Sequence, residues 1–144
     1  HARRKLGVAP VDERQVEVNA AVAQHARRLE QVAGALVAVI GVADVEQAAA
    51  RLRTFVSGKT LESYLSDEML RAAVERQFEI IGEAVGKMAG IDSESAVRIR
   101  DYKKLIAFRN VLIHGYAEVD DQLVCDLIES HLPLLLEDIE SLKS

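Results

Sequence analysis

Two side chains suited to phosphate and proton-transfer chemistry lie five residues apart in the segment 109–116, Arg-Asn-Val-Leu-Ile-His-Gly-Tyr. The guanidinium of Arg109 can hold a phosphate through two hydrogen bonds and stabilise charge that develops on it. An imidazole exchanges protons near neutral pH, so His114 is a candidate general acid or base. RNA carries its own nucleophile, the 2′-hydroxyl. One clamp and one proton-transfer group are therefore enough for cleavage without a metal ion.

Arg109 occupies a helical position that normally holds an apolar residue. At about 100° per residue, the apolar side chains around it form one arc, and Arg109 falls in the middle of that arc. A permanent cation on a packing face is costly unless a partner or ligand meets it. In the alternative interpretation, the arginine stem packs and its head reaches water at the edge of a bundle. The arc consists of Leu105, Ile106, Phe108, Leu112 and Ile113.

Other catalytic and metal-binding patterns are not supported by the spacing. His25 and His131 have no metal-ligand neighbours at helical spacing, and no serine nucleophile arrangement can be identified. The single cysteine, Cys125, excludes an internal disulfide and a multi-cysteine metal site, and it fits a small buried residue best. The Gly-Lys-Thr at 58–60 lacks the first glycine and the preceding strand of a phosphate loop, so it is read as a helix end. We expect no metal and no cofactor.

Composition favours an all-α protein. The 144 residues are 49% apolar, with only two prolines and eight glycines, and strand-like alternation is scarce. The net charge of −5 is not that of a general nucleic-acid binder, so any RNA contact must be local. A basic run before the motif is either a solvated face or a contact for RNA backbone. It comprises Arg98, Arg100, Lys103 and Lys104, of which Arg98, Lys103 and Lys104 are our RNA candidates.

The chain is predicted to divide into an N-terminal extension, 1–41, and a helical-bundle domain, 42–144. The extension is expected to be helical from about residue 12 to about residue 40, with an alanine-rich, weak apolar stripe interrupted at Gly34. We favour an extra helix laid against the bundle over a helix that docks on a partner. No signal peptide is recognised, and the apolar run 33–43 is too short to span a bilayer. We therefore expect a cytoplasmic protein with no membrane contact.

The bundle domain is expected to contain four long helices and a short connector. Asp44, Ser66 and either Ser93 or Ser95 are the predicted caps of the first three helices, and Asp120 or Asp121 begins the last. Pro133 is expected to kink or break that last helix. The predicted spans are 45–56, 66–89, 93–113 and 120–142, with a connector at 61–65.

The motif Arg109, His114, Tyr116, with Asn110 after the arginine, resembles the signature of HepT-type toxins in the HEPN superfamily of α-helical RNases. The whole phrase in a helical context carries the resemblance, and Val119-Asp120 and an amphipathic segment follow it. The segment 79–84, Glu-Ile-Ile-Gly-Glu-Ala, is similar to the second bundle helix of these proteins. The resemblance extends upstream to about Asp44 and covers the C-terminal two-thirds of the chain.

This resemblance implies an antiparallel helical bundle that forms a symmetric homodimer, with Arg109 and His114 brought together from both subunits. It also implies a partner, the MNT-type nucleotidyltransferase antitoxin, which transfers AMP to the motif tyrosine, here Tyr116. Glu83 is read as a solvated surface acid, or alternatively as an acid that meets an arginine across the subunit interface. Tyr116 in its plainer interpretation packs at the turn.

The leading hypothesis is therefore a ribonuclease toxin of a HepT–MNT type system. The alternative is a non-catalytic HEPN module that binds nucleotide or a partner nucleotidyltransferase. A third hypothesis is a dimerising bundle in which the motif is fortuitous.

Overall fold

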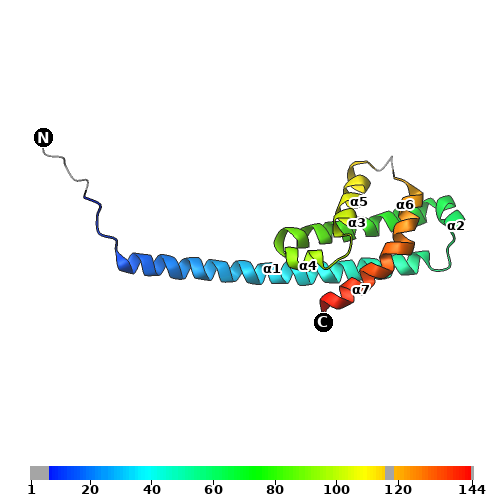
Figure 1. Ribbon diagram of the computed structural model, residues 1–144. Helices are drawn as coiled ribbons and strands as arrows, with labels where there is room; N and C mark the ends of the chain where they lie inside the picture. The colour runs from blue at the N-terminus through cyan, green and yellow to red at the C-terminus, as the bar shows by residue number, and fades with distance from the viewer. Residues whose placement is uncertain (1–6, 116–118, 144) are drawn as a thin grey trace. The chain divides into compact units, whose positions relative to one another are not determined.

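The structure is a computed structural model, and it describes residues 7–115 and 119–143 (Figure 1). Within these ranges the regular structure is entirely helical, which confirms the all-α prediction. The elements are α1 (Glu13–Val56), α2 (Leu61–Ser66), α3 (Glu68–Ile91), α4 (Ser93–Val97), α5 (Tyr102–His114), α6 (Asp121–Asp126), the π-helical turn η2 (Leu127–His131) and α7 (Leu132–Lys143).

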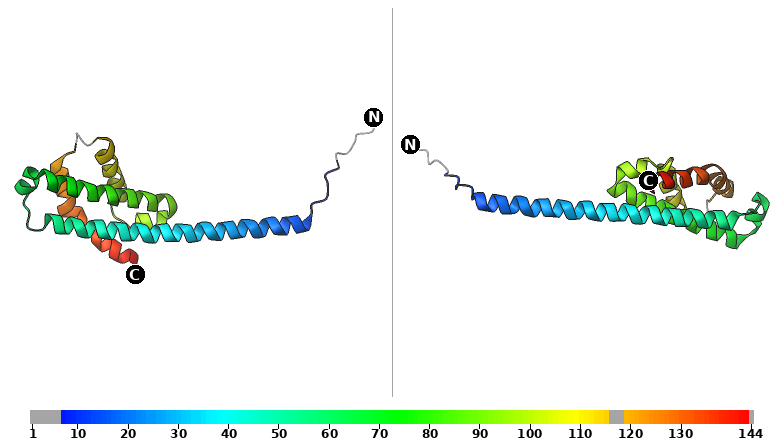
Figure 2. Two further views of the ribbon diagram at one scale, coloured as in Figure 1. Left: turned by 180° about the vertical axis from the view of Figure 1, so that it is seen from behind. Right: turned by 90° about the horizontal axis from the view of Figure 1, so that it is seen from below.

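The first helix, α1, is continuous over 44 residues, so the predicted break between two helices near residue 41 is wrong (Figures 1 and 2). Asp44 lies inside the helix instead of capping it, and Gly34 does not interrupt it. Gly41 is buried, and a Cβ there would lie 2.8 Å from Cγ of Met88. Gly41 therefore allows close packing against Met88. Each glycine inside a helix costs about 1 kcal/mol relative to alanine, and the many alanines around Gly34 and Gly41 offset that cost.

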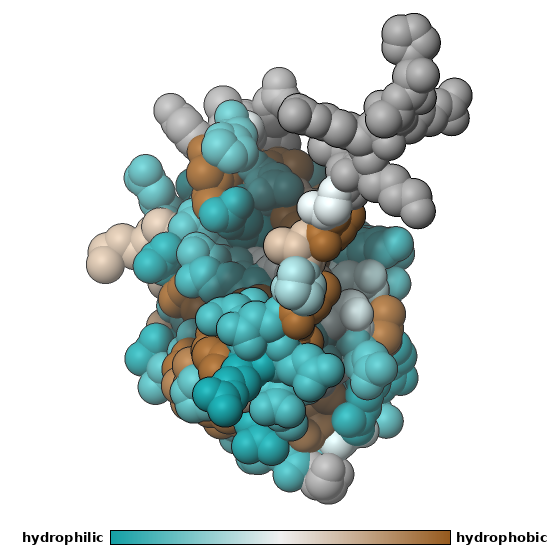
Figure 3. All heavy atoms as spheres, turned by 90° about the vertical axis from the view of Figure 1, so that its left-hand side faces the viewer, coloured by the Kyte–Doolittle hydropathy of each residue, from teal (hydrophilic) through white to brown (hydrophobic). Residues whose placement is uncertain are grey.

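The chain separates into two compact units, residues 1–33 and 34–144. In the first unit, almost all described side chains are exposed. By length and composition alone, α1 is long and apolar enough to cross a membrane, a test that core helices of soluble proteins and signal sequences also pass. In the face shown in Figure 3, apolar residues are interleaved with polar ones.

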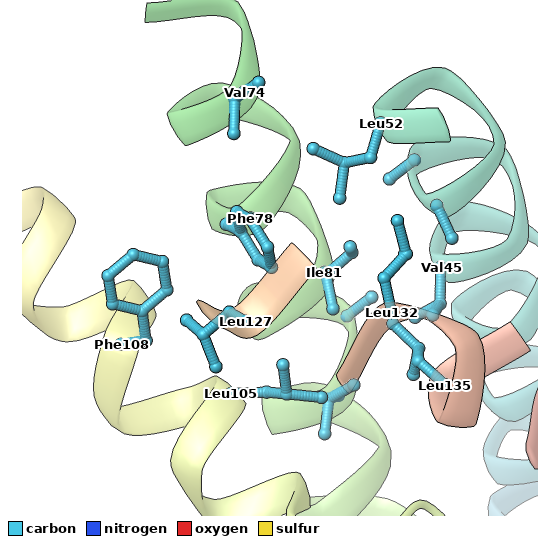
Figure 4. Packing of buried hydrophobic residues seen from close by; sticks show 14 of the residues in the cluster. Val45, Leu52, Val74, Phe78, Ile81, Leu105, Phe108, Leu127, Leu132 and Leu135 are labelled. Carbon is cyan, nitrogen blue, oxygen red and sulfur yellow. The ribbon is translucent and has the colours of Figure 1, made fainter. Parts of the chain in front are cut away.

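The second unit has one hydrophobic core to which each of the described helices, α1 to α7, and the π-helical turn contribute, and Figure 4 shows part of it. α3 supplies the longest row because its apolar residues recur every three or four positions. Phe78 of α3 and Phe108 of α5 meet edge to face, with ring centroids 5.4 Å apart. The residues labelled in the figure are Val45 and Leu52 of α1, Val74, Phe78 and Ile81 of α3, Leu105 and Phe108 of α5, Leu127 of η2, and Leu132 and Leu135 of α7.

The cap of α3 differs from the prediction by one residue, and the predicted connector before it is a short helix. Residues 61–66 form the helix α2. Its N-terminus has a capping box, in which the Thr60 hydroxyl accepts a hydrogen bond from the Ser63 amide and the Ser63 hydroxyl accepts one from the Thr60 amide. Ser66 therefore ends α2, and the cap of α3 is Asp67, whose Oδ1 accepts a hydrogen bond from the Leu70 amide at 3.0 Å. The prediction failed by one residue because serine and aspartate are equally good caps.

The predicted helix 93–113 is in fact two helices, α4 and α5, joined by a turn at residues 98–101. Asp92, and neither Ser93 nor Ser95, caps α4. Asp101 precedes α5 in the left-handed conformation, with φ 60°, which a non-glycine residue rarely adopts. Asp138 of α7 holds this turn, because its carboxylate accepts hydrogen bonds from the Arg100 amide at 2.8 Å and from Nε at 3.0 Å.

The last helical segment begins at the Asp120 cap, as expected, and passes through η2 into α7. The regular α-helix is interrupted just before Pro133 by this wider turn, which ends at His131, in agreement with the expected kink or break. Proline has no amide hydrogen and cannot pair with the carbonyl four residues earlier. A π-helical turn just before it accommodates that lost hydrogen bond without ending the helix.

Candidate active site

The motif arginine lies where α5 crosses α3 at Gly82. A Cβ added at Gly82 would collide with Cβ of Arg109 and lie 2.8 Å from the Leu105 carbonyl oxygen. The two helices can approach this closely only because residue 82 has no side chain. Leu105, Phe108 and Leu112 anchor α5 in the core, so the crossing fixes the root of the arginine side chain.

Arg109 is packed and only partly compensated. Its side chain is 30% exposed, and Nη1 donates a hydrogen bond to Oδ1 of Asn110 at 3.0 Å. Nη2 lies 3.9 Å from Oε2 of Glu83, at the limit of an ion pair. Among the described residues, the buried Nε has no hydrogen-bond partner. A buried donor on a permanent cation is costly, so the site favours an anion or another acceptor.

The apolar arc around Arg109 is narrower than the sequence suggested. Ile113 is 39% exposed and Ile106 is only partly buried, whereas the arc was expected to include both. Arg109 therefore lies at the edge of the packed face instead of at its centre. The packed stem and partly exposed head match the plainer of the two sequence interpretations.

His114 is the last residue of α5 and is exposed. Gly115 ends the helix, and its amide donates to the Val111 carbonyl at 2.7 Å. Five residues on one helix separate Arg109 and His114 by about 140° and about 7.5 Å along the axis. Within one chain the two side chains therefore leave the helix in different directions, and the described contacts do not join them.

Glu83 lies beside the arginine of its own chain. Its carboxylate is 3.4 Å from Nζ of Lys87 and 3.9 Å from Arg109, and its side chain is 50% exposed. This position agrees with a solvated surface acid, and the arginine that it faces belongs to the same chain, so a contact across a subunit interface stays a prediction. Asn110 is exposed and orients the Arg109 guanidinium.

The basic run is divided by the turn before α5. Nη2 of Arg98 donates to the carbonyl oxygen and the hydroxyl of Ser141 at 2.8 and 2.9 Å, so it ties α4 to α7. Lys104 lies 3.7 Å from Asp101, and Lys103 lies over the Tyr102 ring. The two lysines are exposed on the first turn of α5, while Arg98 has a structural role.

A groove of about 290 Å³ lies beside Glu83, between α3 and the part of α1 in the second unit. Acidic, basic and apolar side chains all line this groove. Its lining residues are Val37, Ile40, Gly41, Asp44, Arg76, Ile80, Glu83, Ala84 and Lys87. The described residues contain no cluster of three or more side chains of the kinds that hold a metal. Tyr116 lies outside the described residues.

Gly82 is the site residue that sequence reasoning missed. The signal was present, because a glycine in the middle of a strong helical pattern usually has a packing reason. The sequence could not say which helix would lie against it.

The fold and the site define an all-helical protein in which an arginine at a helix crossing and a histidine at the same helix's end are the candidate catalytic groups. Residues 45–142 match the HepT-like family, described as Ribonuclease HepT-like. The chain therefore belongs to the HepT-like ribonuclease family, as the motif predicted.

Individual relatives carry names of the same kind. The chain is 27% identical over 97 residues to "Putative RNase MJ1380" of Methanocaldococcus jannaschii, a match that covers 67% of this chain and 88% of that protein. It is 29% identical over 87 residues to "Putative RNase TTE0752" of Caldanaerobacter subterraneus subsp. tengcongensis, covering 60% and 77%. A second M. jannaschii protein, "Putative RNase MJ1216", is 30% identical over 88 residues, covering 61% and 72%. No solved structure matches the chain.

Proposed function

We propose that this protein is an endoribonuclease that cleaves RNA without a metal ion, at a cleft formed by two subunits. The observation that carries the proposal is the divergence of Arg109 and His114 on one helix, combined with the unpaired Nε of Arg109. An isologous dimer places two copies of each group near the axis, so an arginine of one chain can face a histidine of the other. The names of the relatives support the reaction class.

In the proposed reaction, Arg109 holds the scissile phosphate and stabilises its developing negative charge. A His114 imidazole accepts the proton of the 2′-hydroxyl, whose oxygen attacks phosphorus. The bond from phosphorus to the 5′-oxygen breaks, and that oxygen takes up the proton that the imidazole had accepted, so no proton is gained or lost overall. The products are a 2′,3′-cyclic phosphate and a 5′-hydroxyl end. Asn110 and Glu83 act as positioning residues for the guanidinium.

The experiment is RNA cleavage by wild type, His114→Ala and Arg109→Ala. His114→Ala should lower the cleavage rate by a factor of about 10² to 10⁴, because it removes the general acid–base group. The variant should fold normally, because His114 is exposed. Arg109→Ala should be similarly inactive, and its effect on stability can have either sign, since it removes a poorly compensated charge. Circular dichroism and sedimentation of both variants serve as folding and assembly controls.

Mixing the two inactive proteins tests the shared cleft. A mixed dimer can assemble one intact Arg109 with one intact His114, so part of the activity should return in the mixture. Full activity of His114→Ala, or cleavage by a demonstrated monomer, would contradict the mechanism. A folded, dimeric wild type that binds nucleotide and leaves RNA intact would favour the non-catalytic HEPN module instead.

We also propose that the protein is the toxin of a toxin–antitoxin pair in the cytoplasm, neutralised by a partner nucleotidyltransferase of the MNT type. The support is the match of Tyr116 to the motif tyrosine, two residues beyond His114. Transfer of AMP to that phenol would put a bulky anion close to the imidazole and block entry of RNA backbone.

A further inference from the structure

The exposed part of α1, which precedes the family match at residues 45–142, carries a heptad repeat over residues 15–39. Its a positions are Gln15, Val22, Leu29 and Leu36, and its d positions are Val18, His25, Val32 and Val39. Spacings of three and four alternate without a fault, as in the seam of a coiled coil. A strict seven-residue repeat is the pattern that makes helices supercoil around one another.

The apolar side chains of this seam are unpartnered. The six valines and leucines at its a and d positions have exposed fractions from 55% for Val18 to 67% for Val32. Single exposed apolar residues need no explanation, but a continuous row on one helix marks an interaction surface. The flanking e and g positions are mostly small and uncharged, which widens the seam. Four of them are alanines, Ala21, Ala26, Ala33 and Ala35.

We propose that this seam, residues 15–39, pairs with the seam of another copy of the same chain, in parallel and in register, as a coiled coil. Such pairing sets polar residues against their own kind, Gln15 against Gln15 and His25 against His25. An antiparallel pairing of the same length would bury Gln15 against Val39 and His25 against Leu29. Matched polar layers are the usual device by which coiled coils fix register.

Charge and area also fit a like copy. Residues 13–40 contain three acidic and three basic residues, so two copies carry no net repulsion although the whole chain has a charge of −5. In the parallel pair, the g residue Arg28 faces Ala33 of the other copy. Each copy contributes six apolar seam residues, and the twelve side chains of a pair would together bury about 700–1,400 Å². That area is in the range of a specific interface, which needs about 1,000 Å².

A lipid bilayer is a poorer fit for this segment. Between Glu30 and Asp44 the chain has 13 uncharged residues, which as a helix are about 20 Å long. The hydrocarbon layer is about 30 Å thick. Arg27 and Arg28 precede this run and would enter the layer if the helix were shifted to span it. The proposal does not depend on ribonuclease activity.

Disulfide cross-linking of the full chain tests the pairing, independently of any dimer formed at the candidate active site. In a Cys125→Ala background, Val18→Cys should give disulfide-linked pairs on mild oxidation, because equivalent d positions face each other in a parallel pair. Val16→Cys is the matched control, since Val16 is an exposed valine of the same helix that lies off the seam. It should not cross-link. Leu at a with Val at d also suits assemblies of more than two strands, and these would give the same cross-link.

Two further variants and one probe complete the test. Adding Val22→Glu to the Val18→Cys chain should lower the cross-linked fraction several-fold, and adding His25→Leu should raise it. Equal cross-linking at positions 16 and 18, or none at position 18, would overturn the proposal. Flotation with vesicles of phosphatidylcholine and phosphatidylglycerol, without cross-linking at position 18, would assign the seam to a membrane and overturn it equally.

Discussion

Arg109 carries a permanent positive charge, its side chain packs against α3 at Gly82, and few groups compensate the charge. The ion pair to Glu83 is long and half-exposed, so it contributes little to stability. The hydrogen bond to Asn110 satisfies one donor, while the buried Nε has no partner among the described residues. An arginine held in this way gains more from an incoming phosphate than one already engaged in a bidentate pair.

Tyr116 is expected to be the acceptor of AMP. It matches the motif tyrosine, and it follows Gly115, where α5 ends. Incubation with the cognate nucleotidyltransferase and ATP should add the mass of AMP to the peptide that contains Tyr116, as read by mass spectrometry. Tyr102→Phe, which changes a half-buried tyrosine, should leave this modification intact. Modification that persists in Tyr116→Phe would contradict the assignment.

Glu75 is a partly buried residue of α3, and its ionisation should lower the free energy of unfolding as pH rises above the acidic range. Burial raises the pKa of its carboxyl above the ordinary value, and Asp121 raises it further. A folded-state pKa above the unfolded one contributes stability that is complete below the unfolded pKa and is lost as pH rises through the folded pKa. Glu75→Gln should therefore stabilise the protein at pH 7, by less than about 1 kcal/mol because solvent screens this partly exposed group.

Urea unfolding of wild type and Glu75→Gln at pH 4 and pH 7 measures this effect. The two proteins should differ less at pH 4, where the glutamate is largely protonated. Glu62→Gln, which removes an exposed acid from α2, is the control for the change in net charge. A Glu75→Gln protein that is less stable than wild type at pH 7 would show that the electrostatic attraction of Glu75 to Arg71 outweighs the cost of its burial.

At the scale of elements, the apolar period of three to four residues predicted the helical class and α3 closely. The boundaries failed where a tertiary contact overrides a local signal. Asp44 has the chemistry of a cap but lies within α1. The predicted helix 93–113 is interrupted at the turn 98–101, because Asp138 of α7 accepts a hydrogen bond from the Arg100 amide there. Neither outcome is encoded near the residue concerned, so single-sequence patterns could not supply it.

Gly82→Ala should separate α3 from α5. The new Cβ would collide with Arg109, and overpacking of this kind costs about 1–3 kcal/mol. Because the root of the arginine would move, RNA cleavage should fall by more than the loss of folded protein explains. Urea unfolding and cleavage rates per folded molecule measure the two effects.

Gly90→Ala is the matched control for that substitution. Gly90 lies on the same helix, and a Cβ there would meet no atom within 4 Å. Alanine should therefore stabilise the protein by about 0.5–1 kcal/mol, as it does in an open helical position. A Gly82→Ala protein as stable and active as Gly90→Ala would show that the helix crossing does not position Arg109.

At the scale of the whole molecule, the sequence pattern anticipated the family and the core of the bundle, but not the continuity of α1. The assignment of residues 1–41 as an accessory extension stays a prediction. The buried residues of α1 apart from Gly41 are Val45, Ala48, Ala49 and Leu52, all beyond that segment. A chain that begins at Val42 should therefore fold and form the proposed active-site dimer.

Thermal unfolding and sedimentation of the truncated chain are the measurements. We expect a cooperative transition close to that of the full chain, and loss of only the association that the α1 seam contributes. An insoluble or monomeric product would make residues 34–41 part of the folded core and would contradict the accessory role.

The contact between Gly82 and Arg109 also limits how this sequence can drift over generations. A larger residue at position 82 fits only if α3 and α5 move apart, because the collision is with the Cβ of residue 109 and with the Leu105 carbonyl oxygen, and both remain whatever lies beyond that Cβ. The two positions cannot exchange sizes and keep the crossing. A lineage that keeps this helix crossing must therefore inherit the glycine 27 residues before the arginine, whether or not it keeps the guanidinium.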